Sequence, residues 1–316
     1  MSDEAAPLAV TVCTVLRHAE DLDRFLEALQ QQSMPASAFD VVVADATPAG
    51  APAPAPGSHR YEIHLVRVAP GTTPGAALNA AWKAAKRPAV GFLAVDAVPD
   101  ATWVEYLSRT LHRGRRLVTG RWEPTLDTLS RAGALQFRLW SSARDAPLVS
   151  VDQLGCHRED LDSAGGFDEQ DDDPYRCALD LAVRLVEAGV DPTFNRWLVC
   201  RYDLEPVDLR QMIATRAVGA DAVRLLASSP GARGRLLTGG VFPGRAQPAA
   251  LLALFGLIFM VRDRRAVILV APWWHQRTCV KPLAAGPRRR RVVLPGVFAF
   301  DVLDAALGLK ARLSKN

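Results

Sequence analysis

The chain has 316 residues, of which 49% are apolar and 23% charged, so it can bury a sizeable core in one large or two modest domains. Its five cysteines are scattered, odd in number and without a C-x-x-C pair, which argues against a zinc knuckle or a disulfide framework and for a reducing cytosol. The net charge of +4 divides unevenly, because residues 210–316 hold 18 basic and 4 acidic residues (+14) and residues 1–209 hold 20 and 30 (−10). This division indicates an acidic body whose basic end meets an anionic surface.

Strands and helices are expected to alternate over the first hundred residues. Leu22, Phe25, Leu26 and Leu29 recur at helical spacing and predict a helix with one buried stripe. The apolar runs between the helices show no polar alternation, which fits strands of a parallel sheet buried on both faces. The predicted strands are 8–15, 39–45, 62–68 and 89–95, and the predicted helices are 21–31 and 74–85.

The pattern loosens beyond Trp103, and the end of the chain is apolar and basic. Two apolar runs, 249–261 and 266–274, are each shorter than the roughly 20 residues that cross a bilayer as a helix. We expect one domain over 1–205 and a mainly helical region over 206–316. The further predicted elements are a helix after 103, strands 116–122 and 148–154, and helices 126–141, 179–188 and 297–313.

Five segments, taken together and in this order, resemble the family 2 glycosyltransferases, which use nucleotide sugars and have the GT-A fold. The resemblance covers about the first 200 residues and implies an α/β, Rossmann-like, mostly parallel sheet flanked by helices. The segments are VTVCTVLRHAEDLDRFLEALQQQSMP at 10–35, VVVAD at 41–45, PGAALNAAWKAA at 74–85, VGFLAVDAVPDATWVEYL at 90–107 and GGFDE…DLAVRLVEAG at 165–189.

The resemblance implies two contacts to the nucleotide. Asp45 stands at the end of the second strand, where the family uses an Asp to hold the base or ribose. Asn79 matches an Asn in the helix beside the nucleotide. From the sequence alone, Asn79 can equally be an ordinary exposed helix residue.

The resemblance also implies a divalent cation, Mg²⁺ or Mn²⁺, which the family holds on the donor diphosphate with an Asp-x-Asp motif. This motif falls on Ala94-Val95-Asp96, so only Asp96 keeps its carboxylate. The loss of one charged oxygen ligand weakens a cation site, and diphosphate oxygens and water can complete the shell. Near Trp197–Tyr202, where the family places a histidine, the sequence offers Cys200 and Arg201.

At the position of the family's general base, the sequence departs further from the family pattern. The Glu-Asp pair that precedes the DLAVRL helix falls on Cys177-Ala178, and alanine cannot accept a proton. Asp180 follows two residues later, and Asp171–Asp173 lie directly upstream. Crowding of three like charges favours proton uptake by one of them, so Asp180 and Asp173 are the candidate bases; the run can also be a solvated loop. Cys177 is read as a small buried residue.

The basic end predicts a contact with an anionic membrane surface, because apolar runs flanked by Trp and Arg suit the bilayer interface. Arg288–Arg291 add four consecutive cations. The alternative is that this end packs on the catalytic domain or forms an oligomer contact. We expect no nucleic acid partner, since aromatic interleaving is thin. The acidic start MSDEAAPLAV gives no secretion signal, so the expected location is the cytoplasm, peripheral on the inner face of the plasma membrane.

The resemblance implies an inverting glycosyltransferase that moves a sugar from a nucleoside-diphosphate donor to a hydroxyl acceptor, lipid-linked or membrane-proximal. The alternative is a catalytically inactive glycosyltransferase-like scaffold or partner-binding protein, which Ala94 and Ala178 favour. A sugar nucleotidyltransferase is disfavoured, because Leu16-Arg-His-Ala19 stands where its Gly-rich loop is expected after the first strand.

Overall fold

The structure is a computed structural model of two compact units. It describes residues 7–51, 57–125, 152–202, 229–242, 244–277 and 287–313, with positions 135–136, 208, 210–211, 213, 224 and 226; for 287–293 only the backbone is described. The first unit holds residues 1–123 and 149–202, and the second holds 124–148 and 203–316. The division of the chain at 205 stays a prediction, and the sequence did not lead us to expect residues 124–148 in the second unit.

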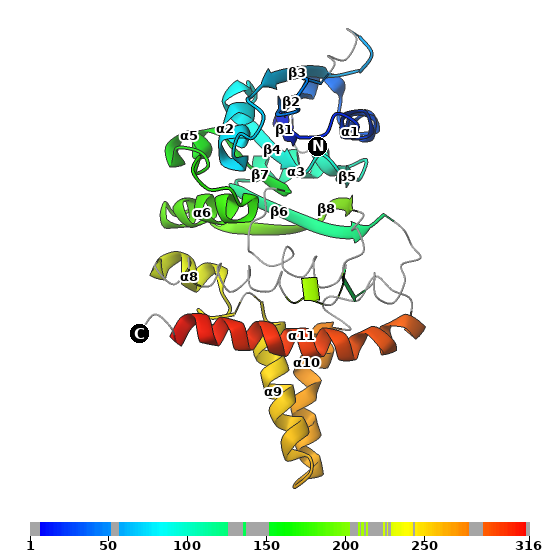
Figure 1. Ribbon diagram of the computed structural model, residues 1–316, viewed down its shortest axis with the longest axis vertical. Coiled ribbons are helices and arrows are strands. Elements are labelled where there is room, and N and C mark those ends of the chain that lie inside the picture. The colour runs from blue at the N-terminus through cyan, green and yellow to red at the C-terminus, as the bar shows by residue number, and fades with distance from the viewer. Residues whose placement is uncertain are drawn as a thin grey trace, which may run out of the picture. The chain divides into compact units, whose positions relative to one another are not determined.

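The first unit is built on an eight-stranded sheet with the strand order β3-β2-β1-β4-β7-β6-β8-β5 (Figure 1). Helices α1, α2, α3, α5 and α6 connect the strands. The strands are β1 Val10–Leu16, β2 Phe39–Asp45, β3 Glu62–Arg67, β4 Ala89–Leu93, β5 Val98–Pro99, β6 Leu117–Pro124, β7 Gln153–His157 and β8 Pro192–Tyr202. The helices are α1 Asp21–Gln30, η1 Ala36–Ala38, α2 Pro74–Ala84, α3 Trp103–His112, α5 Arg158–Ala164 and α6 Pro174–Glu187.

The first four strands pair in parallel, which confirms the α/β fold expected from the sequence. β1 lies between β2 and β4, and β2 continues to β3 at the sheet edge. β4–β7, β6–β7 and β5–β8 pair antiparallel, so antiparallel pairs extend the parallel core β3-β2-β1-β4. β1, β2 and β4 are almost completely buried, whereas the edge strand β3 is half-exposed. The predicted bounds of these four strands differ by two residues or fewer.

Helix α1 buries Leu22, Phe25, Leu26 and Leu29, the stripe that the sequence predicted. Helices α2 and α6 share one hydrophobic cluster with the sheet, in which Trp82, Phe92, Phe167 and Ala178 are all buried. Helix α6 begins at Pro174, five residues before the predicted start at 179. The added turn begins at Asp173, whose carboxylate accepts a hydrogen bond from Tyr175 N (2.8 Å) and so caps the helix.

The second unit is helical in the residues that the structure describes: α8 Pro230–Leu236, α9 Ala246–Phe259, η2 Arg264–Val270, α10 Ala271–His275 and α11 Pro287–Leu313. Within it, α9 packs against η2, α10 and α11. The predicted 297–313 helix is confirmed as the larger part of α11. The predicted 126–141 helix lies outside the described residues apart from 135–136. Among the helices described, none combines the length and the apolar character needed to cross a bilayer.

Candidate active site

Asp45 and Asp96 approach the same edge of the sheet. Asp45 is the last residue of β2, and Asp96 follows β4 by three residues. Both strands run parallel to β1, which lies between them. Because parallel strands end at one edge, the backbone places both residues where ligands of open α/β sheets bind.

Asp45 holds the loop that follows β2. Its Oδ1 accepts hydrogen bonds from Thr47 N (3.0 Å) and Thr47 Oγ1 (2.6 Å), and its Oδ2 accepts from Ala51 N (2.8 Å) and Arg67 Nη1 (2.7 Å). Burial opposes the charge, but these donors outweigh it and lower the pKa of Asp45 to about 2. All four acceptor positions of the carboxylate are therefore used, and a contact with a nucleoside requires one of these bonds to break.

Asp96 is paired with a residue that the sequence reasoning missed. The Tyr202 hydroxyl donates a 2.5 Å hydrogen bond to Asp96 Oδ2, and the Tyr202 ring lies edge-on to Trp122. The pKa of Asp96 is raised, first by burial and further by the charges of Asp152 and Asp21, against the lowering effect of Tyr202. Tyr202 ends the same 197–202 stretch that was searched for a histidine, so its position was the available signal.

Cys200 and Arg201, the residues that the sequence offered in that stretch, are directed elsewhere. Cys200 is fully buried, and burial raises the pKa of its thiol well above the ordinary value. Arg201 forms an ion pair with Asp100 (3.1 Å). Within the part of the chain that the structure describes, no three His, Cys, Asp or Glu side chains gather as a metal cage. Asp96 is thus left as the carboxylate assigned to a cation, with its Oδ2 already accepting from Tyr202.

The Asn79 side chain joins α2 to the segment after α5 through hydrogen bonds, a contact called the Asn79 clamp below. Its Nδ2 donates to Phe167 O (2.9 Å) and Glu169 Oε1 (2.8 Å), and its Oδ1 accepts from Trp82 Nε1 and Phe167 N (both 2.8 Å). The side chain is buried at 2% exposure, so the reading of an ordinary exposed helix residue is wrong. Its amide is saturated by protein groups, and the nucleotide contact implied by the resemblance stays a prediction.

The backbone conformation of the Gly-Gly-Phe-Asp-Glu segment favours glycine at both of its first two positions. Gly165 ends α5 in a left-handed conformation (φ 75°). Gly166 also has a positive φ (76°), and a Cβ there would lie 2.4 Å from Asn79 Oδ1. Glu169 then reaches Asn79 and Lys83, whose hydrogen bonds lower the pKa of the Glu169 carboxyl. The segment 165–169 therefore completes the Asn79 clamp, which holds it against α2.

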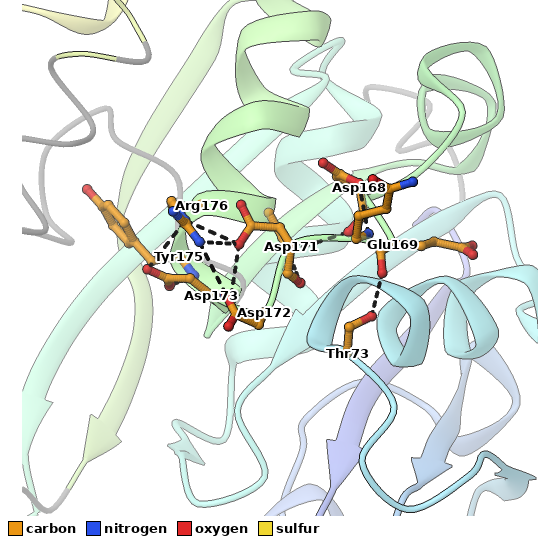
Figure 2. A network of polar contacts seen from close by, with 10 residues as sticks. Thr73, Asp168, Glu169, Asp171, Asp172, Asp173, Tyr175 and Arg176 are labelled. Carbon is orange, nitrogen blue, oxygen red and sulfur yellow. Dashed lines mark hydrogen bonds and ion pairs between the residues drawn. The ribbon is translucent and has the colours of Figure 1, made fainter.

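The acidic run before α6 surrounds a guanidinium (Figure 2). Arg176 contacts Asp171 at 2.9 Å, Asp172 at 3.2 Å and Asp173 at 3.9 Å. The sequence interpretation needed three uncompensated charges, and that premise is wrong because Arg176 supplies the opposite charge. Asp173 caps α6 through Tyr175 N. The role of Asp173 as a base stays a prediction.

Asp180 is engaged by Arg184 one helical turn later. Arg184 Nε and Nη2 both contact Asp180 Oδ2, at 2.9 and 2.7 Å. The same guanidinium donates to Gly166 O (2.7 Å) and to Ala164 O. Asp180 therefore orients an arginine that holds the glycine pair in place, and its role as a base also stays a prediction.

Cys177 and Ala178, which occupy the family's Glu-Asp positions, belong to the buried cluster between α2 and α6. The Cys177 thiol donates to Asp168 O and Asp171 O, at 3.6 and 3.5 Å. Burial and the nearby Asp171 and Asp168 charges raise the pKa of Cys177 to about 11, so the thiol is neutral near pH 7. This agrees with the reading of Cys177 as a small buried residue.

Comparisons with known proteins find one matching family model and several similar solved structures. The profile described as "Glycosyl transferase family 2" matches residues 9–148. Among solved structures, the mannosyltransferase PcManGT from Pyrobaculum calidifontis, in complex with GDP-Man and Mn²⁺, is 16% identical with a TM-score of 0.55, over 98% of this chain and 87% of that one. S. aureus TarS 1-349 is 14% identical with a TM-score of 0.49, over 96% and 89%. A search of curated proteins finds no match.

Residues 9–148 match the family's sequence model, and the whole chain shares its fold with the solved mannosyltransferase. Over residues 9–148 the chain is thus similar to the family 2 glycosyltransferases, and its fold is similar to that of PcManGT.

Proposed function

We propose that the protein is an inverting glycosyltransferase that moves a sugar from a nucleoside-diphosphate donor to a hydroxyl acceptor. The observation that supports this most directly is the arrival of Asp45 and Asp96 at one edge of a parallel sheet within the residues that match the family 2 model. That edge is the ordinary ligand-binding edge of such sheets. PcManGT, which shares the fold, is described in complex with a nucleotide sugar and Mn²⁺.

Donor binding is assigned to the sheet edge and to the loop after β2. Asp45 and Asn79 would face the nucleoside side of the donor, and Asp96 would face the diphosphate side. A divalent cation bound with the donor would neutralise the departing diphosphate. Asp96 alone offers a single carboxylate to that cation, so we expect measurable cation binding only when diphosphate oxygens are also present.

The base is assigned to one of two carboxylates of the α6 region, Asp173 at the N-cap or Asp180 within the helix. Asp173 or Asp180 would take the proton of the acceptor hydroxyl as its oxygen attacks the anomeric carbon and the nucleoside diphosphate departs. Asp173→Asn keeps an oxygen that caps α6, because Asn caps helices about as well as Asp, yet it cannot act as a base. Asp180→Asn keeps one acceptor for Arg184.

A transfer assay separates these assignments. With a purified nucleotide sugar and acceptor, the variant that lacks the base should lose transfer by about a hundredfold or more, with donor affinity unchanged. The other variant should keep its rate. Full activity in both variants would remove both residues as the base.

Calorimetry of donor binding tests the function itself. UDP-sugars and GDP-sugars are titrated into the full chain with and without Mn²⁺, and then into Asp96→Asn. We expect binding that Mn²⁺ strengthens in the wild type and not in Asp96→Asn. The matched control is Asp162→Asn, an exposed aspartate on α5, which should bind as the wild type does. No binding of any nucleotide sugar by the wild type would contradict the proposal.

A second candidate is a scaffold that binds a nucleotide sugar or a partner protein without turnover. Three observations favour it: Ala94 in the cation motif, Ala178 in the buried core, and Arg176 against the acidic run. This candidate predicts donor binding that is indifferent to Mn²⁺, together with no transfer to any hydroxyl acceptor and no donor hydrolysis. Turnover of the donor by the wild type, lost in Asp96→Asn, excludes it.

We place the acceptor at a membrane surface on the cytoplasmic side. Residues 210–316 carry a balance of +14, and the inner leaflet is anionic. A glycosyltransferase held there would meet lipid-linked or membrane-proximal hydroxyls. Transfer to a lipid-linked acceptor in vesicles, compared with the same acceptor in detergent, tests this assignment; equal rates at low and high vesicle charge would count against it.

A further inference from the structure

We propose that the segment formed by α9, η2 and α10 (residues 246–275, the apolar hairpin) binds to the surface of anionic lipid bilayers. The inference rests on the second unit alone and deepens the proposed function by naming the surface that would bring acceptor and enzyme together. Figure 1 shows α9 extending away from α11, and η2 and α10 pack alongside α9. Four separate features of the hairpin support the inference.

Large apolar side chains cover the outside of the hairpin. Ile258, Val261 and Ile268 are 62%, 92% and 71% exposed, and Phe255, Phe259 and Val267 are also exposed. Phe255 and Phe259 contact each other with ring centroids 4.2 Å apart. Contiguous apolar surface of this kind on one element marks an interaction site, in contrast to single exposed apolar residues.

The packing of the hairpin is the reverse of that in a water-exposed helix. Its small residues face inward: Ala250 and Ala253 are fully buried, and a Cβ on Gly256 would lie 2.7 Å from Ala266 O and from Leu269 Cβ. Its large residues on α9 and at the turn mostly face outward, whereas Trp273 at the base is buried. Small residues at the contact and large ones outside are typical of helices that pair in lipid, where the apolar surroundings remove the advantage of burying large side chains.

Helix α1 of the same chain shows the opposite arrangement. It buries its Leu and Phe side chains, and its exposed positions are charged or polar, such as Asp23 and Glu27. The inversion in α9 is therefore a property of this element and not of the chain's composition.

Cations concentrate at the turn of the hairpin. Arg262, Arg264 and Arg265 are all exposed, and Asp263 accepts a hydrogen bond from Arg265 N (2.9 Å), which begins η2. Arginines in the bilayer centre are strongly disfavoured, so the hairpin would lie in the plane of the interface. There its apolar side chains reach the acyl chains and the guanidinium groups reach lipid phosphates.

The base of the hairpin is fixed to α11 by a buried polar cluster. Asp301 of α11 accepts hydrogen bonds from Trp273 Nε1 (2.8 Å) and Arg277 Nε (2.8 Å), and Arg277 Nη2 also contacts it. All three residues are buried, and loss of one partner would leave an uncompensated charge. The cluster holds the hairpin in its extended position, so its apolar outside stays available to a bilayer.

The test is flotation of the full chain with two kinds of vesicle, one of phosphatidylcholine alone and one of phosphatidylcholine and phosphatidylglycerol in equal parts. We expect the wild type to float with the anionic vesicles and much less with the neutral ones. The double variant Phe255→Gln with Ile258→Gln should lose affinity by about tenfold or more, because two large apolar side chains no longer enter the acyl region. The matched control, Phe194→Gln with Leu313→Gln, removes two exposed apolar side chains elsewhere and should float as the wild type does.

The charge contribution is tested by replacing the three turn arginines with Gln. This variant should bind anionic vesicles several-fold more weakly and lose much of the salt dependence. Its control replaces three exposed arginines of the first unit with Gln and should keep both. These control positions are Arg113, Arg115 and Arg196.

Two outcomes would overturn the inference. One is a wild type that stays unbound on both vesicles, or apolar variants that float as it does. The other is a wild-type dimer in sedimentation that Phe255→Gln with Ile258→Gln converts to monomer without any loss of flotation, which would assign the hairpin to a second copy of the chain. Donor calorimetry on the same variants keeps the two proposals apart, because hairpin variants should bind nucleotide sugars normally.

Discussion

The hydroxyl of Tyr202 donates a 2.5 Å hydrogen bond to Asp96 Oδ2, and this bond joins the end of β8 to the turn after β4. It satisfies a carboxylate that burial otherwise penalises. The bond also occupies an oxygen that a cation would need. A substitution of Tyr202 should therefore change the pKa of Asp96, the carboxylate assigned to the cation.

Tyr202→Phe should raise the pKa of Asp96 further, because burial and the charges of Asp152 and Asp21 would no longer be opposed by the phenol. A raised carboxyl pKa means that the folded state prefers the proton, so stability declines as pH rises from about 4 through the folded-state pKa. Carboxylate NMR titration measures the shift. Tyr61→Phe is the control, since its phenol donates to Leu26 O (2.6 Å); identical Asp96 titrations in both variants would contradict the prediction.

Asp45 should stabilise the first unit in the opposite pH direction. Its pKa of about 2 lies below the ordinary value of 3.8, so its contribution is fully present above pH 4 and is lost as pH falls toward 2. Asp45→Asn should cost about 1–2 kcal/mol at pH 7 and roughly half of that at pH 3.

Hydrogen exchange of the β1 and β2 amides reports this difference within the intact chain. The control is Glu27→Gln, an exposed acid on α1, which should show no comparable change with pH. A gap between Asp45→Asn and wild type that stays constant from pH 7 to pH 3 would mean that the carboxylate charge does not hold the loop.

Much of the fold was available from the sequence because it rests on local patterns. The stripe of α1, the unbroken apolar strands and the end of β2 at Asp45 all follow from periodicity and burial. The partners of the site residues were not available. Asn79 with Phe167, Asp96 with Tyr202 and Arg176 with Asp171 join different elements or depend on a turn's exact course, and charge spacing alone cannot show which cation faces an acidic run. The antiparallel pairs of the sheet were missed for the same reason, since strand pairing across long separations leaves no local signal.

The two adjacent glycines after α5 offer a matched pair of substitutions. Both have positive φ (75° and 76°), but a Cβ on Gly165 meets nothing within 4 Å, whereas on Gly166 it would lie 2.4 Å from Asn79 Oδ1. Gly165→Ala should cost about 1–2 kcal/mol of backbone strain. Gly166→Ala should cost about 2 kcal/mol more, because it also disrupts a saturated buried amide. Exchange protection in α2 and α6 measures both, and equal losses would show that the clamp around Asn79 is not tight.

Restoring the family's acid at Ala178 should destabilise the first unit. Ala178 is fully buried, with 0% of its surface accessible to solvent, and it lies in a hydrophobic cluster with Trp82 and Phe167. Ala178→Asp should cost about 3 kcal/mol or more at pH 7, because a carboxylate buried without a partner loses its hydration. Ala178→Asn has the same shape without the charge, and it should cost less.

The difference in stability between Ala178→Asp and Ala178→Asn should depend on pH, because burial raises the pKa of the introduced Asp. As pH falls below that raised pKa, the Asp side chain becomes neutral and the two variants should converge in stability. Exchange protection of α6 across pH 4 to 8 measures the convergence. If Ala178→Asp instead matched the wild type in stability and accelerated sugar transfer, residue 178 would open onto the acceptor, and the base would belong at that position rather than at Asp173 or Asp180.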